Sequence, residues 1–205
     1  MANLPTLPGN YARAVELIDE AHALDPRPSS PEDPTPFETR YARRMTQWLA
    51  VRSPDASPVL QVACRAQHFR RWEDPRSNYP MTKAGYLTWR SKQKSRAAAA
   101  VSELLASPSV QPPIPADDVS RIAALIRKEN LATNEETQAL EDVACLVFLD
   151  DQFDQFEKES GIDEEKMVGI LRKTWGKMSE EGRRLAIGME LSERAKKLIG
   201  KALES

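Results

Sequence analysis

The side chains best suited to chemistry gather in one basic and aromatic stretch, from His68 to Lys94. Guanidinium groups that alternate with flat rings suit phosphate contact together with base stacking. The competing interpretation is that the tryptophans belong to the core and arginine stems cover them. We expect these members of the stretch to bind substrate: Arg71, Trp72, Arg76, Tyr79, Tyr86, Trp89, Arg90 and Lys94. A helix would place Tyr86, Trp89 and Arg90 on one face, because they are three and four residues apart.

His68 is the side chain of this stretch whose ordinary pKa lies closest to neutrality. Neighbouring arginines favour its neutral form, which suits a general base. A lone histidine on a helix can equally be a hydrogen-bonded core residue. We keep His68 as a candidate catalytic residue, with both interpretations open.

A second candidate group consists of carboxylates. Glu141 and Asp142 stand at the entrance of a strongly apolar run, and Glu129 follows Lys128 near the end of an expected helix. A buried acid needs a partner, because burying an unpaired charge is very costly. That partner is either an internal cation or the guanidinium or ammonium group of a ligand. We predict Glu141 and Asp142 as catalytic residues, and Lys128 and Glu129 as substrate-binding residues.

The charges of the chain are unevenly distributed, although the net charge is only −2. From Cys64 to Arg96 there are nine basic residues and two acidic ones, whereas Glu135 to Glu165 contains twelve acidic residues and one lysine. Segments so opposed in sign can bind an anion and a cation, or they can simply pair with each other.

Several classes of protein lack support in the sequence. Two histidines and no paired-cysteine motif cannot readily form a zinc site, and no glycine-rich phosphate loop is present, so we expect no metal and no cofactor. Cys64 and Cys145 lie in apolar stretches and are expected to be buried, reduced thiols. No apolar run is long enough to span a membrane, and residues 1–8 have no basic region followed by an apolar core, so we do not expect them to be a signal peptide. We therefore expect a cytoplasmic protein without membrane or DNA partners.

The elements that must position these residues are predicted to be helices throughout. We expect an all-α fold: one domain over residues 1–205, an irregular bundle of about eight helices around a buried central helix. The central helix starts at Thr133 and contains the apolar run 143–149. Proline-rich loops are expected near 26–36 and 107–115. The other predicted helices cover 11–24, 36–51, 59–72, 81–106, 117–129 and 163–178, with short ones from Ser179 and Ser192.

Several strings of this chain resemble a bacterial and fungal helical family that is catalogued as a domain of unknown function. They are AQHFRRW at 66–72, PR at 75–76, YP at 79–80, GY at 85–86, WR at 89–90, LIRKE at 125–129 and LEDVACLVFL at 140–149. The resemblance extends from about Tyr11 to Leu203. Some members of that family bear the label glutamyl-tRNA synthetase, which fits poorly with 205 residues and no nucleotide loop.

Fungal members of this family resemble arginine-containing cyclodipeptide synthases, enzymes of secondary metabolism that join two aminoacyl groups taken from charged tRNAs. The resemblance implies an aminoacyltransferase whose partners are aminoacyl-tRNAs, including arginyl-tRNA. The basic and aromatic stretch would then bind the tRNA acceptor end. Glu129, Glu141 or Asp142 would bind the substrate guanidinium, and His68 would take a proton from the attacking amine.

An alternative from a different class stays open. A helical hydrolase of the His-Asp type, or a binding module for a small phosphorylated or nucleotide ligand, would use the same basic cluster without tRNA. Phe69 stands after His68 where a hydrolase of that type has an aspartate. Neither the second amino acid of a dipeptide product nor the oligomeric state follows from the sequence.

Overall fold

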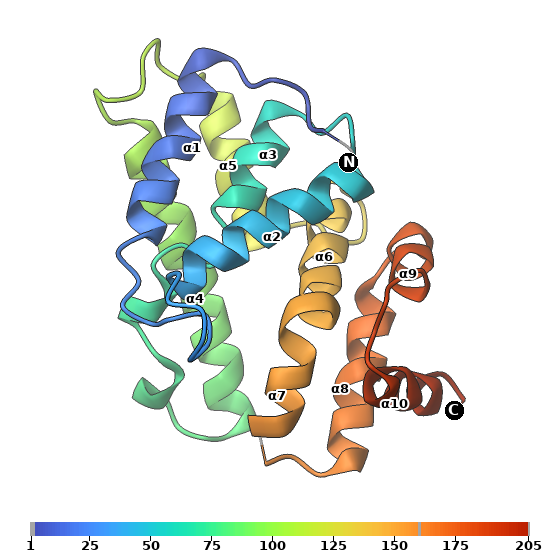
Figure 1. The fold of residues 1–205 in the computed structure, drawn as a ribbon. Helices are drawn as coiled ribbons and strands as arrows, with labels where there is room; N and C mark the ends of the chain where they lie inside the picture. The colour runs from blue at the N-terminus through green and yellow to red at the C-terminus, as the bar shows by residue number, and fades with distance from the viewer. Residues whose placement is uncertain (1–2, 160, 205) are drawn as a thin grey trace. The chain divides into compact units, whose positions relative to one another are not determined.

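The computed structural model describes residues 3–159 and 161–204, and over these residues the fold is all-α, as predicted (Figure 1). Ten α-helices are described where the sequence predicted about eight, partly because the helix expected from Thr133 is divided by a π-helical turn. The chain forms two compact units, Met1–Asn130 and Leu131–Ser205. Each unit is described by itself below.

The first unit contains five α-helices and two short 3-10 turns. α3 packs against α1, α2 and α5, and α5 lies along the long helix α4 (Figure 1). Fully buried side chains from four of these helices, including Ile18, Met45, Leu105 and Ile122, form its core. Each stabilises the fold by about 1.5–3 kcal/mol relative to an exposed side chain. The helices are α1 (Gly9–His22), α2 (Phe37–Arg52), α3 (Pro58–Arg65), α4 (Lys83–Leu105) and α5 (Ala116–Arg127), and the turns are η1 (Arg71–Glu73) and η2 (Arg76–Asn78).

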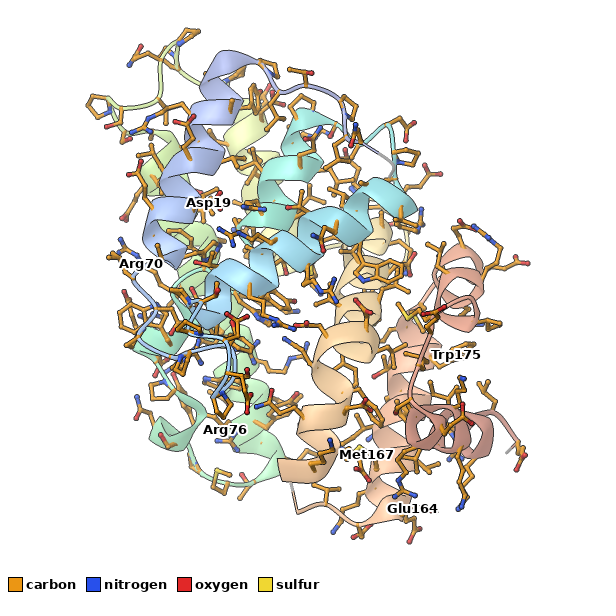
Figure 2. The ribbon with its side chains drawn as sticks, viewed as in Figure 1. Asp19, Arg70, Arg76, Glu164, Met167 and Trp175 are labelled. Carbon is orange, nitrogen blue, oxygen red and sulfur yellow. The ribbon has the colours of Figure 1, made fainter. Side chains whose placement is uncertain are left out.

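A half-buried arginine links the first three helices. Arg65 at the end of α3 donates to both carboxylate oxygens of Asp19 on α1, at 2.6 and 2.7 Å, and to the hydroxyl of Thr46 on α2 at 3.0 Å. Asp19 is labelled in Figure 2. The two-pronged geometry is the strong form of an arginine–carboxylate pair. These contacts therefore fix the position at which the segment after Arg65 leaves α3.

The helix predicted over 59–72 is wrong beyond Arg65. His68 and Arg70 have left-handed backbone conformations, with φ of 65° and 50°, which a continuing α-helix does not permit. The chain instead turns sharply and forms η1 at Arg71. His68 consequently lies in a tight turn and not on a helix face.

The second unit contains five α-helices and one π-helical turn. α6 packs against α8 and α9, and α10 packs on α8 (Figure 1). Nine of the thirteen residues of α6 are buried, including Glu141 and Asp142, so this helix is as buried as its apolar run predicted. The elements are α6 (Glu135–Val147), the π-turn η3 (Phe148–Gln152), α7 (Phe153–Glu159), α8 (Glu164–Lys177), α9 (Glu180–Ile187) and α10 (Glu193–Leu203).

The helix starts in the second unit follow local capping rules. Asn134, Asp163, Ser179 and Ser192 each accept a hydrogen bond from a backbone N–H of the first turn. The starts predicted at Ser179 and Ser192 are confirmed.

Neither cysteine forms a disulfide and both are buried, as predicted. Burial raises the pKa of the Cys64 thiol to about 12, which removes it as a nucleophile near neutral pH. Among the described residues, the helices are all too short or too polar to cross a lipid bilayer.

Candidate anion-binding site

The buried carboxylate of Glu38 organises the turn that carries the candidate site. It accepts hydrogen bonds from three consecutive backbone N–H groups, those of Arg70 at 3.0 Å, Arg71 at 2.7 Å and Trp72 at 3.3 Å. Left-handed conformations at residues other than glycine cost about 1–2 kcal/mol each. The charged hydrogen bonds to Glu38 offset this cost at His68 and Arg70 and fix the position of Arg71.

Glu38 is itself held from several sides. Its second oxygen contacts Nδ1 of His22 at 3.1 Å, and the other ring nitrogen of His22 contacts the carbonyl oxygen of Arg65 at 2.9 Å. Asp25 accepts the backbone N–H of Glu38 and pairs with Arg27. Glu38 was not predicted as part of the site, because an acid in the first turn of a helix usually indicates only a favourable interaction with the helix dipole.

The surroundings of His68 favour its neutral form. Its ring stacks on Tyr41, with centroids 4.1 Å apart and planes 9° from parallel, and its Nε2 lies 2.5 Å from a guanidinium nitrogen of Arg71. Burial, followed by the charges of Arg71, Lys128 and Arg90, lowers the pKa of His68 well below its usual range. The neutral form that the sequence predicted is therefore supported. The lone pair of Nε2 is nevertheless engaged by Arg71, and a base at this nitrogen would need that contact to open.

Arg71 is an arginine that lies against a tryptophan ring and forms no ion pair with a described residue. Its guanidinium lies 4.4 Å from the centre of the Trp89 ring, and burial is the main cause that lowers the pKa of Arg71. The nearby charges that act on it include Arg90 and Arg27, which also lower its pKa. Among the described residues, no carboxylate lies within ion-pair distance of the Arg71 guanidinium. A buried cation without a counter-ion is costly, so this arrangement indicates an anion-binding site.

Arg90 extends this positive region along α4. Its guanidinium carbon lies 5.8 Å from the centre of the Tyr86 ring, and Tyr86 tilts against Trp89 at 6.0 Å. Tyr86 is 43% exposed, whereas Trp89 is buried and donates its ring N–H to the carbonyl oxygen of Asp74. Trp89 is thus a core residue whose ring also contacts the guanidinium of Arg71. It therefore fits both interpretations of the sequence, a core tryptophan and a member of a cationic site. We call His68, Arg71, Tyr86, Trp89 and Arg90 the Arg71 cluster.

Two predicted substrate-binding residues hold the connector between η1 and α4. Arg76 donates to the carbonyl oxygens of Tyr79 at 2.9 Å and Pro80 at 2.7 Å (Figure 2). The hydroxyl of Tyr79 donates to Asp74 at 2.7 Å. These contacts give both residues a role in positioning this connector, and substrate binding by them stays a prediction.

The remaining predicted residues of the first unit lie in different settings. Lys128 ends α5 in a left-handed conformation and is one of the charges that act on His68. Glu129 is exposed and accepts a hydrogen bond from Arg127 at 2.5 Å. Lys94 is half-buried on α4. The ring N–H of Trp72 is buried without a hydrogen-bond partner among the described residues.

Glu141 and Asp142 belong to the second unit, where both have partners. Asp142 accepts hydrogen bonds from the backbone N–H and the hydroxyl of Ser179, at 2.8 and 2.5 Å, and from the side chain of Gln138 at 2.9 Å. Glu141 lies 3.6 Å from the ammonium group of Lys177. Asp142 therefore fixes the start of α9. Catalytic roles for these two acids, and a shared cavity with His68, stay predictions.

The donor set of the Arg71 cluster determines what it can do. It offers N–H donors and aromatic faces, and its own residues include no acid. Over residues 3–159 and 161–204 no group of three histidine, cysteine, aspartate or glutamate side chains is placed to hold a metal ion. The cluster can neutralise an anionic group and can stack a flat ring against Tyr86.

Comparison with known proteins gives a family and no named activity. No curated protein and no solved structure matches this chain. The model of one family matches residues 12–199, nearly the whole chain and every residue of the Arg71 cluster. The chain therefore belongs to the family described as domain of unknown function DUF4202.

Proposed function

We propose that this protein is a tRNA-dependent aminoacyltransferase that forms an arginine-containing cyclic dipeptide from two aminoacyl-tRNAs. One observation carries the proposal: the buried guanidinium of Arg71, which faces Trp89 and His68 and has no carboxylate partner among the described residues. The resemblance of fungal members of the family to cyclodipeptide synthases suggests aminoacyl-tRNA as the substrate of this anion site.

A phosphodiester of the tRNA acceptor end suits the Arg71 cluster. It would supply a negative charge to Arg71 and Arg90, for which the described residues provide no ion pair. The exposed ring of Tyr86, with Arg90 against it, is a suitable surface on which a single-stranded base can stack. Each stacked base contributes about 1–3 kcal/mol to binding.

The reaction needs no nucleotide hydrolysis, because an aminoacyl ester is already activated. The α-amine of one aminoacyl group attacks the ester carbonyl of the other; an amide forms, the ester bond breaks and the proton passes to the released tRNA hydroxyl. The free amine of the resulting dipeptidyl-tRNA then attacks its own ester carbonyl. This second aminolysis closes the diketopiperazine ring and releases the second tRNA.

An acid is still required to bind the arginine side chain of the substrate. Glu129, Glu141 and Asp142 remain the proposed candidates. Glu129 is the most exposed of them and accepts a hydrogen bond from Arg127, whereas Asp142 is buried and its oxygens accept hydrogen bonds from Ser179 and Gln138. This difference favours Glu129 or Glu141 over Asp142.

Metabolite profiling of a heterologous host tests the proposal directly. Cells that express the wild-type chain should accumulate a new arginine diketopiperazine, detected by mass spectrometry with isotope-labelled arginine. Arg71→Met should abolish it, whereas Arg13→Gln, which removes an exposed arginine that pairs with Glu16 and Glu20, should not. A soluble wild-type chain that gives no labelled product, with charged tRNA present, contradicts the proposal.

The same cluster could instead serve a binding module for a small phosphorylated ligand. Purified protein separates the two functions. An aminoacyltransferase consumes arginyl-tRNA and loses this activity after ribonuclease treatment of the tRNA. Tight binding of a mononucleotide, without consumption of arginyl-tRNA, supports the binding module.

A further inference from the structure

The contact between His68 and Arg71 determines which nitrogen of the His68 ring carries the proton. A guanidinium can only donate, so Nε2 of His68, 2.5 Å from Nη1 of Arg71, must accept. In the neutral ring the proton is then on Nδ1. That Nδ1 is buried, and no hydrogen-bond partner for it exists among the described residues.

A buried N–H donor without an acceptor costs about 1–3 kcal/mol, so such atoms are rare and concentrate at functional sites. The surroundings prevent His68 from escaping this cost by rotation. Its ring lies flat against Tyr41, its backbone is fixed in the left-handed region, and Arg71 holds Nε2. Arg71, Lys128, Arg90 and His22 are the charged or titratable groups that act on the ring. The arginines and the lysine can only donate, and both ring nitrogens of His22 already contact Glu38 and the carbonyl oxygen of Arg65.

We infer that His68 is a fixed hydrogen-bond donor for a phosphate group: its Nδ1–H binds one phosphate oxygen while Arg71, held by Nε2, and Arg90 supply the positive charge. This role differs from that of a general base, because His68 then neither gains nor loses a proton. The inference depends on the proposed function only for the molecule that carries the phosphate.

Nuclear magnetic resonance of the free chain tests the tautomer. The chain contains two histidines, so a ¹⁵N-histidine sample of the wild type and one of His68→Asn assign both rings. We expect the His68 ring to show the Nδ1–H neutral tautomer from pH 5.5 to pH 8. A proton on Nε2, or a titration of His68 within this range, would refute the inference.

Two substitutions separate the two nitrogens of the ring. Asparagine places an N–H donor near the position of Nδ1 and tolerates a left-handed backbone, whereas glutamine places an acceptor near Nε2 without the donor. Titration with inorganic phosphate, and with a short single-stranded RNA that has a 5′-phosphate, should show a smaller loss of affinity for His68→Asn, which keeps the donor but not the contact of Nε2 with Arg71, than for His68→Gln. For His68→Gln we expect affinity about tenfold lower, as for the loss of one hydrogen bond to a charged group.

Control measurements separate a loss of phosphate binding from a loss of folding. Circular dichroism and the melting temperature establish that each variant is folded. Equal affinity in His68→Gln and the wild type overturns the inference, even if product formation fails. Weaker phosphate binding by folded His68→Gln upholds it, even if the proposed dipeptide is never detected.

Discussion

The carboxylate of Glu38 accepts the backbone N–H of Arg71 at 2.7 Å, across 33 residues of sequence. Through this contact the first turn of α2 fixes the backbone position of Arg71, from which its guanidinium group extends. The same carboxylate accepts the N–H groups of Arg70 and Trp72, so the strained turn around His68 depends on one buried acid.

We predict that Glu38→Ala lowers the free energy of unfolding by about 3–5 kcal/mol, because it leaves three backbone donors and His22 without their acceptor. Glu38→Gln keeps one oxygen and should cost less. Chemical denaturation gives both values. Glu32→Gln, at an exposed acid of the neighbouring loop, serves as the control and should change the free energy by less than about 0.5 kcal/mol. A cost for Glu38→Ala as small as that of the control would contradict this role.

Arg71→Met should separate stability from binding. Methionine fills a similar volume against Trp89 and removes a buried charge that has no counter-ion in the described structure, so the free energy of unfolding should stay equal or rise by about 1 kcal/mol. Affinity for tRNA should fall at the same time, and the slope of log affinity against log salt should become shallower by about 0.7–1. A strongly destabilised Arg71→Met chain would instead show that Arg71 is structural.

The close approach of α4 to its own connector gives a third prediction. A Cβ atom at Gly85 would lie 2.1 Å from the carbonyl oxygen of Pro80, so Gly85→Ala must displace the connector. We expect a loss of about 1–3 kcal/mol in unfolding free energy, together with weaker RNA binding because Tyr86 moves. Gly169→Ala on α8 meets nothing within 4 Å and should stabilise its helix by about 0.5–1 kcal/mol. A neutral Gly85→Ala would show that the connector is free to shift.

The segment from Val59 to Arg90 was predicted correctly in part. Helical periodicity correctly predicted a helix at each end of it, and the spacing of Tyr86, Trp89 and Arg90 correctly placed them together on α4. Periodicity reports only local preference. It could not predict the break after Arg65, because that break depends on Glu38, which lies about thirty residues earlier and meets the turn only in the folded chain.

The same limitation applies to the candidate site. Composition identified the arginines, but the distinction between Arg71, which has no acid partner in the described structure, and Arg76, which binds three carbonyl oxygens, is a matter of tertiary contacts. The buried acids of α6 were expected to have partners, and those partners became visible only with the contacts to Ser179 and Lys177.

The role of Asp142 can be decided by coupling it to Ser179. Ser179 donates to Asp142 through its hydroxyl and also caps α9 by accepting from the N–H of Gly182, whose missing Cβ leaves room for the Asp142 carboxylate. We predict that Asp142→Ala and Ser179→Ala each destabilise the fold, and that a double-mutant cycle gives a coupling energy of about 1–3 kcal/mol. Activity should then fall only in proportion to the folded fraction. If folded Asp142→Asn loses all product formation while the coupling energy is near zero, Asp142 acts on the substrate and its contact with Ser179 is incidental.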